Sequence, residues 1–298
     1  MATQATTIGP KLFTRDSIRG QQRSRQLVDK LMTGLITLCA VLAVAMLVFI
    51  LAYVIIRGVP ALNLAFFTER PLPMGEVGGG VAPAIIGTLM MMAAAALMGV
   101  PIGIGTAIYL AEYGRGRFAT IVRFLIDLIS GIPSIVVGVF VWALLVRQII
   151  GHFSGLAGSV ALAIIMIPIV TRTVEEVLRL VPDMYREASL ALGVPRWKTI
   201  IAIVLPTAKS GVITGVVLSM ARAGGETAPL MLTALGNQFF SFDLWQPMAA
   251  LPVQIYNYAV APYDDWHTKA WGAALILIMV VGLLSFITRQ VTRGGLSK

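Results

Sequence analysis

The sequence predicts an all-α membrane protein with six transmembrane helices. Of its 298 residues, 57% are hydrophobic and only 12% are charged, which is far from the balance of soluble globular domains. Several apolar runs reach roughly 20 residues, the length that a helix needs to cross a hydrocarbon core about 30 Å thick. Helices are expected because an open strand edge in lipid would leave backbone groups without hydrogen-bond partners.

Each long apolar run predicts one span of a single membrane domain over residues 31–298. The first span is expected at 31–56, behind a polar and basic tail at 1–30, because this run is longer than a signal-peptide core and shows no small-residue cleavage site. The other spans are expected at 84–110, 121–147, 156–181, 204–226 and 270–288. Prolines inside these spans should kink them, namely Pro101, Pro133 and Pro168.

The net charge of +9 is explained by membrane orientation, because the basic residues are dispersed between apolar runs and form no nucleic-acid patch. Four basic segments share one expected face: Lys11 to Lys30, Arg115 to Arg123, Arg172 to Lys198 and Arg289 to Lys298. The other face has few cations: Arg57, Arg70, Arg147 and Lys269. The positive-inside rule therefore predicts that both termini and the loops 111–120 and 182–203 are cytoplasmic.

The connection 227–269 is then expected to be extracytoplasmic. Its aromatic residues suit a membrane interface or a docking surface for a partner, two readings that the composition leaves open: Phe239, Phe240, Phe242, Trp245, Tyr256, Tyr258, Tyr263 and Trp266. Cys39 is the only cysteine, so an internal disulfide and a CxxC site are excluded. His152 and His267 stand alone, and no metal site is expected.

The segment with the most specific sequence pattern begins with the loop 182–203. It runs from Pro182 to Pro206 and reads PDMYREASLALGVPRWKTIIAIVLP. Pro182 suits the start of a short helix, and Gly193 followed by Pro195 should end it. Ala188, Ser189 and Ala191 are small enough for another protein's backbone to approach, while Met184, Tyr185 and Leu192 supply apolar anchors. From spacing alone, an amphipathic interfacial linker is an equal alternative.

These residues resemble the cytoplasmic loop of bacterial binding-protein-dependent ABC importer permeases. The family pattern is E-A-A, three residues, G, nine residues and I-x-L-P. The matching residues are Glu187, Ala188, Gly193, Ile203, Leu205 and Pro206, with Ser189 in place of the second alanine. The resemblance implies the fold of a type I ABC importer permease, with a coupling helix between the fourth and fifth spans that docks on an ATPase subunit.

Further segments resemble the PstA-type permease of the phosphate-specific importer: Gly87 to Tyr113, Ile132 to Gly138, Gly225 to Gly236 and Leu244 to Ala259. The resemblance implies a complex with a second homologous permease, a pair of cytoplasmic ATPase subunits and an extracytoplasmic phosphate-binding protein. Lys198-Thr199 and Lys209-Ser210 lack the glycines of a phosphate-binding loop. We therefore expect no enzyme activity in this chain, and ATP and magnesium on the partner ATPase.

Two charged residues follow the apolar run of the fifth span, in the stretch ARAGGETAPL. Arg222 lies sixteen residues after Pro206, or about 24 Å along an uninterrupted helix, and Glu226 would lie one turn further on the same face. Ionisable residues within the membrane are functional candidates by default, although a merely structural Arg222–Glu226 ion pair is the alternative. The resembling family associates the arginine and glutamate of this R-A-x-G-E-T segment, which ends at Thr227, with transport.

The chemistry of phosphate suggests a separate role for each of the two residues. The fork of donors on Arg222 matches two oxygens of an anion. The carboxylate of Glu226 could accept the hydroxyl that phosphate retains near neutral pH, or hold Arg222 until substrate arrives, whereas sulfate has no such donor. A permease for another oxyanion, of the sulfate or molybdate class, is the nearest alternative. A proton-coupled secondary transporter using Glu226, or a membrane scaffold, is a more distant one.

Two further expectations concern charges near the cytoplasmic ends of the spans. Arg123 and Asp127 are one turn apart and should form a structural ion pair. Glu175 and Glu176 should belong to a polar network between elements rather than to a proton relay.

Overall fold

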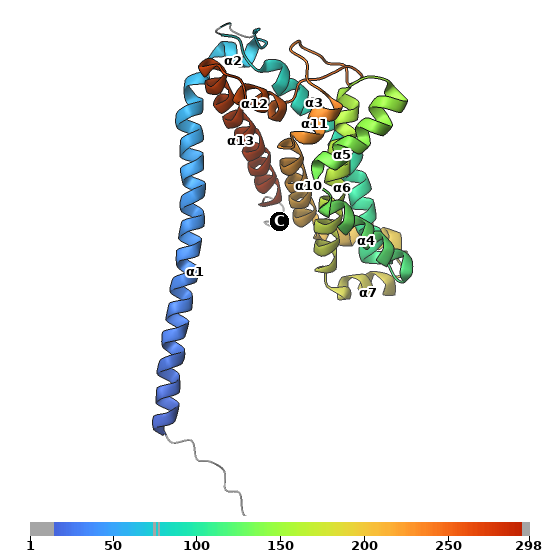
Figure 1. Ribbon diagram of the computed structural model, residues 1–298. Helices are drawn as coiled ribbons and strands as arrows, with labels where there is room; N and C mark the ends of the chain where they lie inside the picture. Colours follow the sequence, from blue (N-terminus) through green and yellow to red (C-terminus); the bar gives the residue numbers. More distant parts are fainter. Residues whose placement is uncertain (1–14, 74–75, 77, 294–298) are drawn as a thin grey trace, which may run out of the picture. The chain divides into compact units, whose positions relative to one another are not determined.

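The computed structural model describes residues 15–73, 76 and 78–293. The chain forms two units, residues 1–53 and 54–298. In the described part of the first unit, the chain is one helix, α1 (Arg15–Gly58), which continues to the start of the second unit (Figure 1). Its apolar side chains between Leu27 and Tyr53 are largely exposed, as lipid-facing side chains would be.

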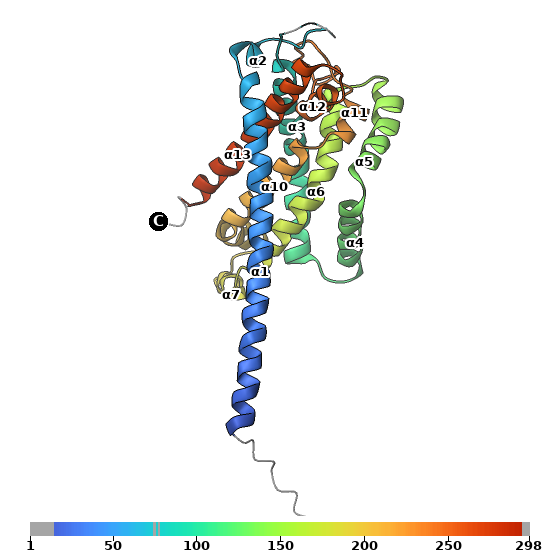
Figure 2. The ribbon, with the colours of Figure 1, turned by 60° about the vertical axis from the view of Figure 1, so that its left-hand side comes forward.

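The second unit is a bundle of helices of very different lengths. After η1 (Val59–Ala61) come α2 (Leu64–Thr68), α3 (Ala82–Ile108), η2 (Tyr109–Tyr113), α4 (Arg117–Gly131), α5 (Ser134–Val141), η3 (Trp142–Ile150), α6 (Gly155–Arg179), α7 (Asp183–Ala191), α8 (Arg196–Thr199), η4 (Ile200–Val204), α9 (Leu205–Thr207), α10 (Lys209–Gly224), α11 (Ala228–Thr233), α12 (Leu251–Ala259) and α13 (Asp264–Arg293). Figures 1 and 2 show α7 at one end of this bundle and α2, α11 and α12 near the other.

The described helices supply four unbroken candidate spans, at Arg25–Ala61, Ala82–Tyr113, Gly155–Arg179 and Asp264–Leu283. Two further candidates are bent pairs: Arg117–Gly131 with Ser134–Ile150, at 101°, and Arg196–Thr207 with Lys209–Gly224, at 75°. The total reaches six only if each bent pair crosses as one span. The expected third and fifth spans are therefore broken helices.

Of the three prolines expected to kink a span, one lies at a break between two helices. Pro101 and Pro168 lie inside α3 and α6, each of which continues past its proline. Pro133 lies at the break between α4 and α5, where Ile132 is extended with ψ at 132°. A residue before proline is pushed out of the helical region, because the proline ring collides with its backbone. The break is thus encoded locally.

The fifth span differs most from its prediction. The chain turns between α9 and α10 at Ala208, so the distance from Pro206 to Arg222 does not follow one straight helix. In addition, α10 ends at Gly224, and Glu226 lies beyond its end rather than on the same helical face as Arg222. Two consecutive glycines, Gly224 and Gly225, lie at this end, where helix propensity is low.

The centre of the bundle is the close contact of α3 with α6. A Cβ on Gly99 would lie 3.1 Å from the Ala163 carbonyl oxygen, and one on Gly103 would lie 2.8 Å from the Val170 Cβ. Small residues let two backbones approach in this way, as in other membrane helix pairs. The two helices therefore meet with little side-chain material between them.

The connection 227–269 is partly helical and partly core. It contains α11 and α12, and its aromatic residues divide into two groups. Tyr258 and Trp266 are 1% and 7% exposed and pack together with ring centroids 4.9 Å apart. Phe239, Phe242 and Trp245 are exposed and remain available to a membrane interface or a partner. The two interpretations of this segment, a membrane interface or a docking surface for a partner, therefore apply only to the exposed group.

Candidate functional site

Arg222 and Glu226 line one cavity of about 360 Å³. Its other lining residues come from the end of α4, the α4–α5 break, α5 and the middle of α6: Ile129, Ser130, Gly131, Ile132, Pro133, Ser134, Val137, Ile165, Pro168 and Ile169. The cavity thus forms where α4 breaks and where α10 ends. Both irregularities bring polar backbone and side chains next to an otherwise apolar wall, which membrane proteins tolerate at a cavity.

The two charged residues occupy different positions relative to α10. Arg222 is in its last turn and is exposed, and a cation there is favoured by the partial negative charge of a helix C-terminus. Glu226 is half-buried, and its backbone N–H donates to the carbonyl of Ala223 at 3.2 Å. Among the described residues, the ion pairs within 4.0 Å do not include Arg222 with Glu226. The structure therefore does not support the purely structural ion pair.

The N-terminus of a helix contributes to the wall of the cavity. Ser134 is the first residue of α5 and lies in the wall, and a helix N-terminus carries partial positive charge and unsatisfied N–H groups. Ser130, at the end of α4, donates its hydroxyl to the Ile126 carbonyl at 3.0 Å, so its oxygen can only accept a further hydrogen bond and offers an anion no donor. Thr227 precedes α11 and is not part of the cavity lining. Its role in the pathway stays a prediction.

The short helix expected after Pro182 is α7, and it ends before Gly193, whose φ is +77°. Glu187 and Ala188 are exposed. Tyr185 and Leu192 are 48% and 83% exposed, so the predicted apolar anchors stand free on the surface of the unit. An exposed apolar surface rimmed by charge is typical of a site that binds another protein.

Ser189 does not lie on this exposed surface, contrary to the expected role in admitting a partner's backbone. It is 3% exposed, and its hydroxyl lies 2.9 Å from that of Thr199 at the end of α8. The departure from the family's alanine therefore adds a hydrogen bond that holds α7 against α8. The sequence pattern alone could not reveal this, because the partner is ten residues away on another helix.

We expect Ser189→Ala to lower the free energy of unfolding by about 1 kcal/mol, the usual net value of one buried hydrogen bond. The measurement is the midpoint of thermal unfolding in detergent. Ser210→Ala, at an exposed position on α10, is the control and should leave the midpoint unchanged. Equal midpoints for the two variants would contradict the role assigned to Ser189.

A buried ion pair that the sequence did not suggest fixes α7 to the end of α3. The carboxylate of Glu112 in η2 accepts hydrogen bonds from Arg186 Nη2 at 2.7 Å and Nε at 3.1 Å. Their side chains are 4% and 18% exposed. The hydrogen bond that Arg186 donates to the Glu112 carboxylate raises the pKa of Arg186 above its ordinary value. Since the two residues are 74 positions apart, local spacing gave no signal for the pair.

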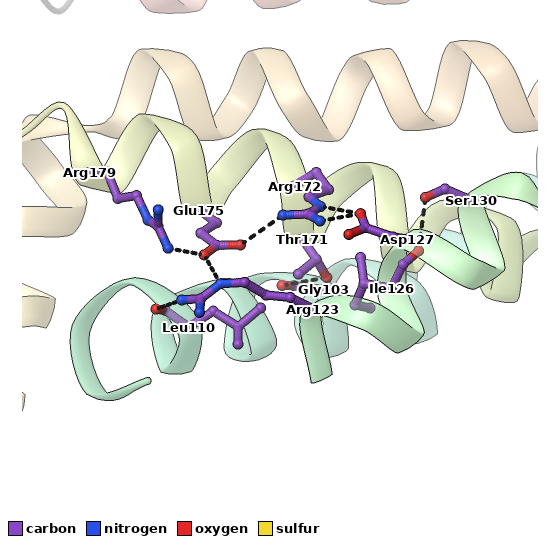
Figure 3. A network of polar contacts seen from close by, with 10 residues as sticks. All are labelled: Gly103, Leu110, Arg123, Ile126, Asp127, Ser130, Thr171, Arg172, Glu175 and Arg179. Carbon is purple, nitrogen blue, oxygen red and sulfur yellow. Dashed lines mark hydrogen bonds and ion pairs between the residues drawn. The ribbon is translucent and has the colours of Figure 1, made fainter. Parts of the chain in front are cut away.

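A second network joins α4 to α6 (Figure 3). Glu175 is buried, and its Oε1 accepts from Arg123 Nε at 2.8 Å and from Arg179 Nη2 at 2.6 Å. Asp127 accepts from Arg172 Nε at 2.8 Å. The expected Arg123–Asp127 pair is therefore wrong: each residue on α4 pairs with α6 instead. The expectation that Glu175 belongs to a network between elements agrees with these contacts, whereas Glu176 is exposed.

The described residues contain no group of three or more His, Cys, Asp or Glu side chains able to hold a metal. Fold and cavity together define a class: a helical membrane transport subunit, because ionisable side chains at membrane depth typically mark a transport pathway.

Comparison with known proteins gives the family. Residues 99–294 match the model of the binding-protein-dependent transport system inner membrane component. The phosphate transport system permease protein PstA of Haemophilus influenzae is 46% identical over 266 residues, which cover 89% of this chain and 94% of the relative. PstA of Mycobacterium leprae is 42% identical over 244 residues, covering 80% of each. The chain belongs to the inner membrane components of binding-protein-dependent transport systems and, within them, to the PstA permeases.

Solved structures support the fold alone. The inward-facing MetNI methionine ABC transporter matches with a TM-score of 0.62 at 21% identity, covering 72% of this chain and 95% of that chain. An amino acid ABC transporter matches with a TM-score of 0.51 at 16% identity, covering 71% and 93%. Both are ABC transporter chains, and the expected type I permease fold agrees with them.

Proposed function

We propose that this chain is a membrane-spanning subunit of an ATP-driven importer of inorganic phosphate, and that its cavity is part of the translocation pathway. The observation that carries the proposal is the placement of Arg222 and Glu226 in one cavity without a mutual ion pair. A guanidinium group can bind two phosphate oxygens at once. A nearby carboxylate can accept a hydrogen bond from the hydroxyl group of phosphate, a donor that sulfate lacks at neutral pH. The names of the PstA relatives support the same substrate.

The proposed partners are a second, homologous permease that completes the pathway, two ATPase subunits that bind ATP and magnesium, and an extracytoplasmic phosphate-binding protein. The ATPase would dock on α7, where Glu187, Tyr185 and Leu192 are exposed. We propose that α7 and both termini are cytoplasmic, which is what the distribution of the basic residues predicts. The exposed aromatic residues of 227–269 would then face the side where the binding protein delivers phosphate.

The test is uptake of labelled phosphate into proteoliposomes that contain the chain with its candidate partners. We expect uptake to require ATP, to persist in excess sulfate and to fall at least about tenfold in Glu187→Ala, which removes an exposed charge of the docking helix. Glu176→Ala removes an exposed glutamate from α6 and serves as the matched control. Competition by sulfate would favour another oxyanion. Uptake by the chain alone, driven by a proton gradient, would favour a secondary transporter.

A further inference from the structure

The segment η2, at the end of α3, is held by two arginines from the α7–α8 segment. Arg186 binds the Glu112 carboxylate and also donates to the carbonyls of Leu178, at 2.9 Å, and Val181, at 2.6 Å, at the end of α6. Arg196 on α8 donates to the backbone carbonyl of Glu112, and its guanidinium lies 5.0 Å from the centre of the Tyr113 ring. Thus η2 cannot separate from α7 and α8 without breaking charged hydrogen bonds.

The same segment is held by α4 from another side. Arg123 Nη2 donates to the Leu110 carbonyl at 2.8 Å, and Figure 3 shows this arginine between η2 and Glu175. Glu175 fixes the other edge of the guanidinium, since it accepts from Nε at 2.8 Å. Carbonyls at the end of a helix lack intrahelical partners, so they are free to accept such bonds. The arginine therefore connects the end of α3 directly to α4.

The far end of α4 forms the cavity. From Arg117 to Gly131 the helix has 15 residues, or about 22 Å, and Ser130, Gly131 and Pro133 at its end line the cavity beside Arg222. The apparent direct route, along the fifth span from the α7 loop to Arg222, is interrupted by the 75° bend at Ala208. In contrast, α4 is unbroken over its whole length.

We propose that η2 is the junction through which movement of α7 reaches the substrate cavity, with Arg186–Glu112 as the input contact and Arg123–Leu110 as the output contact to α4. The inference rests on the proposed function, because it assumes that an ATPase moves α7. Arg186, Glu112 and Arg123 are positioning residues: they contact neither the substrate nor the ATP. Their role is to make α4 follow α7.

The first experiment measures phosphate taken up per ATP hydrolysed by the reconstituted complex. Glu112→Gln removes the charge of the input contact with almost no change in volume, and Arg123→Gln removes the output contact. We expect both variants to assemble and hydrolyse ATP, with phosphate per ATP reduced about tenfold, within the usual range of coupling between sites. Arg172→Gln is the matched control: it also removes an α4–α6 ion pair but does not contact η2, and its ratio should equal that of the wild type.

A second readout is independent of the transported anion and separates the two proposals. Spin labels at Leu128→Cys on α4 and Gln148→Cys on η3, in a Cys39→Ser background, report the distance between α4 and η3 with and without ATP in the complex. We expect a nucleotide-dependent change in this distance that disappears in Glu112→Gln and Arg123→Gln. If the change persists in both variants, or if both keep the wild-type ratio of phosphate to ATP, the junction is refuted. A nucleotide-dependent change without phosphate uptake would refute only the choice of substrate.

Discussion

Replacing Arg222 with lysine is expected to lower ATP-dependent phosphate uptake about tenfold, and replacing it with alanine about 100-fold. A hydrogen bond to a charged group contributes about 1.5–3 kcal/mol, and each 1.4 kcal/mol is a factor of ten. Lysine keeps the charge but loses the planar fork that can bind two oxygens of one phosphate. Alanine loses both and leaves Glu226 as the only charged residue of the cavity lining, where it would repel the anion.

The measurement is the initial rate of phosphate uptake at several phosphate concentrations in the reconstituted complex. Arg147→Lys is the matched control, because Arg147 is an exposed arginine near the end of η3 and does not line the cavity. It should transport like the wild type. Wild-type uptake by Arg222→Lys would show that charge alone suffices, and wild-type uptake by Arg222→Ala would remove this residue from the pathway.

A large loss of stability is expected from Gly87→Ala on α3. A Cβ at this position would lie well inside contact distance of the Ala249 carbonyl oxygen and 2.8 Å from the Met248 Cγ. Backbone cannot move aside as a flexible side chain can, so α3 would have to shift away from the segment before α12. Overpacking of this kind costs about 1–3 kcal/mol.

Gly105→Ala provides the control on the same helix. A Cβ on Gly105 meets nothing within 4 Å, and alanine raises helix propensity by up to about 1 kcal/mol. Thermal unfolding in detergent should therefore show a lower midpoint for Gly87→Ala and an equal or higher midpoint for Gly105→Ala. If the midpoint decreased equally in both variants, the loss of stability would come from adding a Cβ anywhere on α3 and not from the contact with Ala249.

Much of the fold could be predicted from the sequence because lipid imposes a simple rule of length and polarity. The long apolar runs gave α3, α6 and α13, and Pro182 with Gly193 bounded α7. The breaks were harder to predict. Of the three prolines expected to kink a span, only Pro133 lies at a break between helices, whereas α3 and α6 continue past Pro101 and Pro168. The presence of a proline alone does not distinguish these two outcomes.

Only part of the candidate site could be predicted from the sequence, because the rest depends on how the helices pack. Arg222 and Glu226 were identifiable because charge is costly at membrane depth wherever it occurs. Their partners in the cavity come from α4, α5 and α6, which only the fold brings together. The error about Arg123 and Asp127 has the same origin. Spacing of one turn favours a pair on an isolated helix, but a buried Glu175 on α6 competes for the same arginine.

The helix α6 contacts α3 and α4 through two different kinds of interaction. Toward α3, Gly99 and Gly103 meet its backbone and side chains by close fit, and no charge is involved. Toward α4, it is held by ion pairs, of which Asp127 with Arg172 is the more exposed. A close fit is lost once the surfaces separate, whereas oppositely charged groups attract over several ångströms and can pair again. We therefore expect the α3–α6 contact to stay closed during transport, and the α4–α6 contact to be the one that can open and form again.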